Sequence, residues 1–244
     1  MRFGKIFGIE IAAGTRGELL SKCSELMAVG GAVSTVNPEI LGNALKNKEL
    51  YDALSKSLNI PDGIGVEKAL MIRGVKSERF PGVELGEALL DIKPATLAII
   101  GGEGNSAKRA MANLCHAHPL ASPAFYCDGY NYSVERIVSM LRRHNPDIVF
   151  VCMGSPKQEI FIKRIRACSK GSLFVALGGS IDIYSGKKQR APALMRNIGC
   201  EWVYRIIREP ARIKRVPALF SFAYKSVKEA DFLRKSAENS AKEP

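Results

Sequence analysis

Short apolar runs alternate along the chain with longer stretches in which apolar and polar residues recur at helical spacing. The apolar runs, rich in Val, Ile and Phe, predict strands at 6–11, 32–37, 96–100, 123–127, 147–153 and 172–178. The stretches between them predict helices at 15–29, 38–56, 64–72, 83–91, 105–116, 133–143 and 157–168. Nearly continuous apolar strands that alternate with helices are typical of a parallel sheet that is covered on both faces. We therefore predict an α/β fold with a mostly parallel sheet and helices on both faces.

Glycine and polar residues gather where the predicted strands end. The segments at these ends read TVNPE, IIGGEG, CDGY, CMGSPKQE and LGGSID. In open parallel sheets, ligands bind outside the carboxyl ends of the strands. We therefore expect the functional site along this edge of the sheet.

The character of the chain changes at about Gly199, where basic and aromatic residues become frequent. Residues 187–244 hold 14 Lys and Arg against 6 Asp and Glu, so most of the formal net charge of +12 lies there. Such an asymmetry indicates an anionic partner for this end of the chain. We divide the chain into a core at 1–198 and, at 199–244, a basic helical C-terminal appendage with a polar tail.

Four arginines of the appendage recur at helical spacing, at Arg205, Arg208, Arg212 and Arg215. We expect Pro210 and Pro217 to break this region into short helical pieces. An apolar run, 216–224, follows the arginines, and a basic element next to an apolar one is typical of helices that lie on a membrane surface. We predict peripheral membrane contact through residues 200–224, with insertion of Leu219, Phe220 and Phe222. A solvated basic face is the alternative.

Composition narrows the class of protein. The 244 residues, 46% of them apolar and 25% charged, suffice for one large core or two small ones. No apolar run approaches the roughly 18–20 residues of a membrane-spanning helix, and the apolar stretch at the N-terminus is too short for a signal peptide. The six cysteines are scattered singly, which argues against a zinc module or a disulfide framework. We expect a cytoplasmic protein.

One glycine motif suggests an oxidoreductase. The segment 102–107 satisfies G-x-G-x-x-A between a predicted strand and a predicted helix, and Asp128 follows near the position of a ribose-binding acid. However, about 95 residues precede the motif, whereas it normally belongs to the first βαβ unit. A nicotinamide-dependent oxidoreductase that uses the turn at Gly102 and Gly104 is our second hypothesis. A nucleic-acid-binding protein is the third and weakest, because no basic-aromatic platform accompanies the charge.

A series of ordered sequence blocks carries a more specific signal. The blocks are TVNPE (35–39), PDGIGV (61–66), ERFPG (78–82), DGY (128–130), GSPKQE (154–159), GGSID (178–182), Gly186 with RAP (190–192), EWVYR (201–205) and EPAR (209–212). In order and spacing, from about residue 5 to residue 216, this series resembles the WecG/TagA/CpsF family of bacterial glycosyltransferases.

The resemblance implies a reaction, a fold and partners. Members of this family have a Rossmann-like core and transfer a sugar from a UDP-sugar donor to a polyprenol-diphosphate-linked sugar acceptor, typically N-acetylglucosamine. The type reaction moves N-acetylmannosamine or its uronic acid with inversion, in teichoic acid or surface polysaccharide biosynthesis. It takes place at the inner face of the cytoplasmic membrane, with help from the C-terminal appendage. The resemblance implies no cofactor, metal or nucleic acid, and it leaves homo-oligomer formation open.

The same resemblance assigns roles to individual residues. It implies that Asp62 is the catalytic base and that Arg79 binds the departing diphosphate. The appendage arginines Arg205, Arg212 and Arg215 match basic positions of the family, and it stays open whether they contact the UDP diphosphate, the lipid diphosphate or anionic headgroups. An Asx-turn at Asp62 and a surface ion pair between Arg79 and Glu78 are the alternatives. The further positions implied for substrate binding are Thr35, Asn37, Gly102, Gln158 and Asp182. The sequence contains no D-x-D pair that could hold a metal on the diphosphate.

Overall fold

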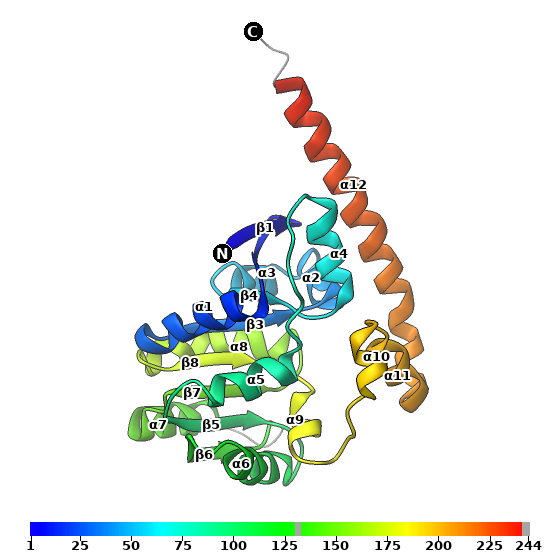
Figure 1. The fold of residues 1–244 in the computed structure, drawn as a ribbon. Helices are drawn as coiled ribbons and strands as arrows, with labels where there is room; N and C mark the ends of the chain where they lie inside the picture. Colours follow the sequence, from blue (N-terminus) through cyan, green and yellow to red (C-terminus); the bar gives the residue numbers. More distant parts are fainter. Residues whose placement is uncertain (130–132, 241–244) are drawn as a thin grey trace.

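A six-stranded parallel sheet forms the centre of the molecule (Figure 1). The computed structural model describes residues 1–129 and 133–240, so Tyr130 of the DGY block and residues 241–244 of the tail lie outside it. The strand order in the sheet is β4-β3-β8-β7-β5-β6. Its strands are β3 (Gly31–Val36), β4 (Leu58–Pro61), β5 (Ala95–Gly101), β6 (Ala121–Cys127), β7 (Ile148–Cys152) and β8 (Leu173–Ala176). This confirms the predicted α/β fold, which is consistent with a Rossmann-like core.

Helices cover both faces of the sheet. Successive strand residues point to opposite sides, and because both sets are apolar here, both faces must be buried. Ile99 and Phe150 face one layer, made of α1 (Arg16–Val29), α5 (Gly82–Leu90), α6 (Ser106–Ala117) and α9 (Ser180–Tyr184). Ala98 and Val151 face the other layer, made of α7 (Val134–His144) and α8 (Lys157–Ile165), which the 3-10 turn η1 (Arg166–Cys168) follows. These strand residues are at most 1% exposed, which explains why the strands are apolar without a polar alternation.

A second apolar core, which includes Ile6, Ile11 and Leu41, lies beside the sheet. Two predictions in this part of the chain were wrong, and one strand of the sheet was not predicted. The predicted strand 6–11 is an antiparallel hairpin, β1 (Arg2–Ile6) and β2 (Ile9–Ala13), because the chain turns through positive φ at Phe7 and Gly8. The predicted helix 38–56 divides into α2 (Pro38–Ala44) and α3 (Lys48–Leu54), because Asn47 caps a new helix: its Oδ1 accepts from Leu50 N at 3.0 Å. Strand β4 was not predicted at all.

The chain ends in a group of helices that folds back onto this second core. These are α10 (Ala193–Asn197), α11 (Glu201–Arg208), the 3-10 helix η2 (Pro210–Arg215) and α12 (Val216–Ser240). Pro217 lies in the first turn of α12, where its missing N–H costs nothing, so it does not break the helix as predicted. The polar tail continues α12 from Lys225 as far as Ser240.

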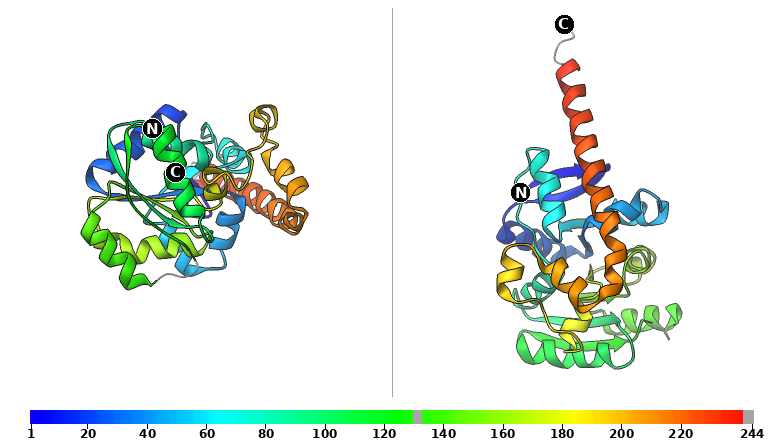
Figure 2. Two further views of the ribbon diagram at one scale, coloured as in Figure 1. Left: turned by 90° about the horizontal axis from the view of Figure 1, so that it is seen from below. Right: turned by 90° about the vertical axis from the view of Figure 1, so that its right-hand side faces the viewer.

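Helix α12 packs along α2 and α4 (Ile64–Ile72) and then extends past the body of the molecule (Figures 1 and 2). Phe222 is only 3% exposed and packs edge-on against Phe7, with 5.6 Å between ring centroids. The predicted insertion of Phe222 into a membrane is therefore wrong, because this side chain belongs to the second core. Within residues 1–129 and 133–240, no helix has the length and apolar character needed to cross a membrane.

Candidate active site

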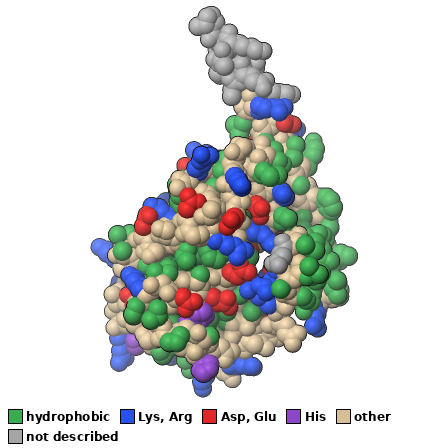
Figure 3. Space-filling model, viewed as in Figure 1, with side chains coloured by type: hydrophobic (Ala, Val, Ile, Leu, Met, Phe, Trp, Pro, Cys, Tyr) green, Lys and Arg blue, Asp and Glu red, His purple; other side chains and the backbone are tan. Residues whose placement is uncertain are grey.

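A cavity of about 710 Å³ opens at the carboxyl edge of the sheet, between the core and the C-terminal helices. Residues that follow β3, β4, β7 and β8 line one side of it, as the α/β rule predicts. Residues of α11, η2 and α12 line the other side. In Figure 3, acidic and basic side chains gather where the core meets the C-terminal helices, and apolar side chains cover the neighbouring surface of those helices.

Asp62 lies in the wall of this cavity, directly after β4. Its N–H donates to Val36 O at 2.8 Å, which ties it to the neighbouring strand end. Gly63 then adopts a φ of +92° and begins α4, a conformation that favours glycine. Burial raises the pKa of Asp62 to about 6, although Arg205 and Arg79 partly oppose this rise. The carboxyl group therefore titrates close to neutral pH, which suits a general base.

Thr35 and Asn37 reach the same cavity from the end of β3. Thr35 is 6% exposed, and its Oγ1 donates to Ala176 O at 3.0 Å across to β8. Asn37 Oδ1 accepts from Ile40 N at 3.0 Å and so caps α2. Both side chains are held in fixed positions by bonds within the protein.

Gln158 is fixed more tightly, in the first turn of α8. Its Oε1 accepts from Gly178 N at 2.9 Å, and its Nε2 donates to Glu159 Oε1 at 2.9 Å. Because a backbone N–H only donates and the carboxylate accepts, these two bonds set the orientation of the amide. Gln158 lines the cavity and is 3% exposed. Its neighbour Glu159 is 2% exposed, and burial raises the pKa of this carboxyl group.

Arg79 reaches the cavity from the loop between α4 and α5. Its guanidinium donates to the backbone carbonyl of Arg196 in α10 and lies 4.0 Å from Glu67 Oε2. The alternative ion pair with Glu78 is not formed, because Glu78 Oε2 instead accepts from Arg16 N at 2.9 Å. Arg79 thus connects the core to the C-terminal helices at the edge of the cavity.

The three appendage arginines also line the cavity, and each faces an acidic side chain. Arg205 pairs with Glu201 one turn earlier in α11, and Arg212 Nε donates to Glu209 at 2.7 Å. Arg215 NH1 lies 3.0 Å from Glu39 on α2. The predicted single stripe is divided between α11 and η2, and Arg208 stacks on Tyr204 instead of lining the cavity.

Two predicted substrate-binding residues lie elsewhere. Gly102 makes the turn after β5 with a φ of +76°, and a Cβ there would meet Ile181 Cγ1 at 3.1 Å. Asp182 lies 2.7 Å from Lys188, which in turn contacts Glu209 at 2.9 Å. Neither residue is among those that line the cavity. The structure does not bring them together with Asp62.

Comparison with known proteins decides the family. Residues 4–236 match the model described as "Glycosyl transferase WecG/TagA/CpsF family". The chain belongs to this family of glycosyltransferases. Similar proteins named N-acetylglucosaminyldiphosphoundecaprenol N-acetyl-beta-D-mannosaminyltransferase occur in Bacillus subtilis (34% identical, over 82% of this chain and 80% of the relative) and Bacillus spizizenii (33%, over 77% and 75%). One from Staphylococcus aureus strain MW2 is 29% identical over 84% of this chain and 82% of the relative.

Membership of the WecG/TagA/CpsF family leaves the oxidoreductase hypothesis without support. The glycines that suggested it have a local explanation, since Gly101, Gly102 and Gly104 all adopt positive φ in the turn from β5 to α6. A tight strand-to-helix turn needs such residues whatever the ligand is.

Sequence reasoning missed an ionic cluster beside the cavity of this family member. Glu84, in the first turn of α5, faces three guanidinium groups: Arg16 NH1 at 2.6 Å, Arg196 NH1 at 3.4 Å, and Arg190. Arg190 itself lines the cavity. The RAP block contained Arg190, but no spacing along the chain could relate it to Glu84.

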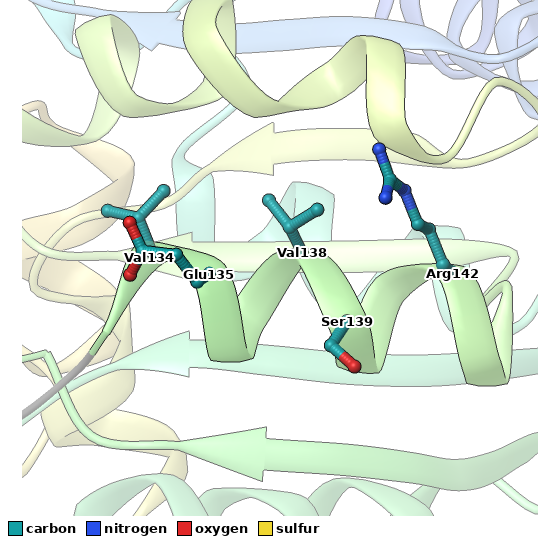
Figure 4. Close-up of a pocket in the computed structure, with 5 residues that line it drawn as sticks. All are labelled: Val134, Glu135, Val138, Ser139 and Arg142. Carbon is teal, nitrogen blue, oxygen red and sulfur yellow. The ribbon is translucent and has the colours of Figure 1, made fainter.

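A second hollow, of about 490 Å³, lies along the exposed side of α7. Figure 4 shows Val134, Val138 and Arg142 pointing to one side of this helix, while Ser139 points away. It contains no predicted site residue. Among the described residues, no group of three or more His, Cys, Asp or Glu side chains is placed to hold a metal ion.

Proposed function

We propose that this protein transfers N-acetylmannosamine or its uronic acid from a UDP-sugar to polyprenol-diphosphate-linked N-acetylglucosamine, with inversion and without a metal ion, in teichoic acid or surface polysaccharide biosynthesis. The names of its relatives support the acceptor and the sugar. The observation that carries the proposal is that Asp62, with a pKa near 6, shares one cavity with Arg79 and Arg205.

In this proposal Asp62 acts as the base for the acceptor hydroxyl. As the proton moves to the carboxylate, the hydroxyl oxygen forms a bond to the anomeric carbon of the donor sugar. The bond from that carbon to the diphosphate breaks on the opposite face, and UDP leaves with the electron pair. Thr35, Asn37 and Gln158 supply fixed polar groups around the reacting sugars.

Arginines take the place of a metal at the leaving group. Arg79, Arg205, Arg212 and Arg215 line the cavity, and guanidinium groups recognise phosphate oxygens through paired hydrogen bonds. The diphosphate that they bind belongs to UDP or to the lipid acceptor. Gly102 and Asp182, which lie outside the cavity, take no part in this proposal.

We also propose that the appendage, residues 199–244, holds the protein at the inner face of the cytoplasmic membrane. Ile207, Ile213 and Tyr224 are 67%, 62% and 69% exposed on α11, η2 and α12, among basic residues such as Arg208 and Lys214. Large exposed apolar side chains beside positive charge favour an anionic lipid surface.

The membrane proposal predicts a specific loss of lipid binding. Replacing Ile207, Ile213 and Tyr224 together by Ser should reduce co-flotation with anionic vesicles, because the variant lacks the apolar side chains that would be buried in the lipid. Val29→Ser is the matched control, since Val29 is 71% exposed on α1. Equal flotation of the triple variant and the control would contradict the membrane proposal.

The reaction itself is tested by UDP release. The assay combines a synthetic prenyl-diphosphate-GlcNAc acceptor with UDP-ManNAc, UDP-ManNAc uronic acid, UDP-GlcNAc or UDP-glucose, with and without EDTA. We expect acceptor-dependent release from one donor, insensitive to EDTA and lost in Asp62→Asn. Release that needs a metal, or full activity of Asp62→Asn, would overturn the corresponding part of the proposal. No release with any donor would overturn the reaction.

A further inference from the structure

The cavity is polar at one end and apolar at the other, and the apolar end continues between two helices. Beyond Asp62, the lining passes to one side of α4, with Ile64 and Ile72, and to one side of α12, with Leu219, Ala223 and Val227. The intervals along α12 are four residues each, so these side chains form a stripe along one face of the helix. We call the space between the two helices the α4–α12 groove.

The two walls of this groove are fixed to each other at the far end, and near the polar end α4 is held against the turn that precedes α11. Near the polar end, Gly199 packs so closely on Ile64 that a Cβ would lie 2.6 Å from Ile64 Cδ1. At the far end, Arg73 NH1 donates to Ser226 Oγ at 2.8 Å, and NH2 donates to Ser226 O at 3.0 Å and to Glu229. The groove therefore exists before any ligand arrives.

The groove leaves apolar side chains open to water. Ile72 is 50% exposed, Val227 is 43% exposed and Phe220, which also lines the cavity, is 73% exposed. Lys68 lies between Ile64 and Ile72 on α4 and also lines the cavity. The aliphatic part of a lysine side chain packs on apolar surface while its ammonium group stays in water. Covering these side chains with an apolar ligand would be favourable.

We propose that the α4–α12 groove binds the first isoprene units of the acceptor lipid, an inference that rests on the proposed function. The groove is continuous with the arginine-lined end that suits a diphosphate, and in a prenyl diphosphate the apolar chain follows the diphosphate directly. Ile64 and Ile72 lie about 12 Å apart along α4, at 1.5 Å per residue. That length takes the start of a single extended chain rather than a folded partner.

The experiment compares acceptors that differ only in their lipid. GlcNAc-diphosphate esters of dimethylallyl, geranyl and farnesyl alcohol are used below micelle-forming concentrations and without vesicles. The readout is the ratio of the acceptor KM for the dimethylallyl ester to that for the farnesyl ester. Burial of the longer chain in the wild-type groove predicts a ratio of at least about tenfold.

Two pairs of variants make the test specific. Ile72→Asp and Val227→Asp place a charge in the groove and should bring the ratio close to one. Met71→Asp and Leu233→Asp are the matched controls, because Met71 is 55% exposed on α4, Leu233 is 49% exposed on α12, and neither lines the cavity. The controls should keep the wild-type ratio. An unchanged ratio in both groove variants, or an equal loss in the controls, would overturn the proposal.

A binding measurement separates this proposal from the reaction. Trp202 lines the cavity and is the chain's single tryptophan, so its fluorescence reports on ligands there. If the wild-type protein turns over no acceptor, the proposed reaction fails and farnesyl diphosphate becomes the probe. Weaker quenching of Trp202 in Ile72→Asp than in Met71→Asp would still support the groove, and equal quenching would overturn it.

Discussion

Asp62 illustrates how a local backbone arrangement produces a chemically useful group. The bond from its N–H to Val36 O holds it between two parallel strand ends, and Gly63 turns the chain away into α4. Helix α4 begins without a side-chain cap, so the carboxyl group remains at the cavity instead of closing a turn. Removal from water then raises its pKa to about 6, and the nearby Arg205 and Arg79 limit the rise.

This pKa predicts the pH dependence of turnover. A base must be deprotonated, so kcat/KM should be level above about pH 7 and fall about tenfold per pH unit well below pH 6. The measurement is UDP release from pH 4.5 to 8.5, with stability checked at each pH. An acid limb centred near pH 4, the range of an ordinary aspartate, would contradict the assignment of Asp62.

The same shift predicts that Asp62→Asn stabilises the protein. A carboxyl group whose folded pKa is raised stabilises the fold fully below its unfolded pKa of about 3.8, and this contribution is lost as the pH rises through 6. At pH 7.5, asparagine removes the buried charge and should raise the free energy of unfolding by up to about 3 kcal/mol. At pH 4 the gain should disappear. Urea unfolding at the two pH values measures this difference, and a gain that is equal at both would contradict it.

At the scale of elements, the hydrophobic pattern predicted the strands and helices whose positions are fixed by burial in the core. Strands β5, β7 and β8 are buried on both faces, so their apolar runs were recognised and the parallel sheet followed. The pattern failed where a turn depended on backbone geometry. Phe7 adopts a φ of +54°, which a bulky residue rarely does, so Gly8 was the one signal of a turn in the run from Ile6 to Ile11. The appendage was predicted to be helical but in short pieces, and the length of α12 was not predicted because its stability comes from packing against α2 and α4.

The docking of α12 makes a prediction about Glu229. This carboxylate pairs with Arg73, whose side chain is only 7% exposed, and accepts from Phe7 N at 3.0 Å. Glu229→Ala should lower the free energy of unfolding by about 1–3 kcal/mol, because a nearly buried guanidinium loses its charge partner. Asp231→Ala, on the same helix in a weak pair with Arg234 at 3.9 Å, should change it by less than about 0.5 kcal/mol. Equal losses in thermal or urea unfolding would contradict this.

At the scale of the whole molecule, the candidate site has one side that sequence could predict and one that it could not. The carboxyl ends of parallel strands meet at one edge, so Thr35 and Gln158 were expected together. Asp62 was placed with them only by the family resemblance, because β4 was not predicted. The opposite side comes from the C-terminal helices α11, η2 and α12, whose position depends on contacts such as Arg79 with Arg196 O. No periodicity specifies such a contact. Gly102 and Asp182 lie outside the cavity although they follow strands of the same sheet, β5 and β8.

The carboxylate of Glu84 joins these two sides of the site through its ion pairs. Arg16 and Arg79 belong to the core, whereas Arg190 and Arg196 lead into the C-terminal helices, and Glu84 pairs with three of these four. Glu84→Gln keeps the shape but leaves like charges together, so we expect a loss of about 2–4 kcal/mol in stability. Trypsin should also cut faster at Lys187 and Lys188.

The control for Glu84 is Glu103→Gln, because Glu103 holds the same segment through an exposed pair with Lys187 at 3.1 Å. Since an exposed pair contributes little, this variant should keep wild-type stability and cleavage rate. UDP binding, followed by Trp202 fluorescence, should weaken only in Glu84→Gln, because Arg190 lines the cavity and loses its partner. If both variants behaved alike, the C-terminal helices would be held by their apolar contacts with α2 and α4, and the arginine cluster would be a surface feature.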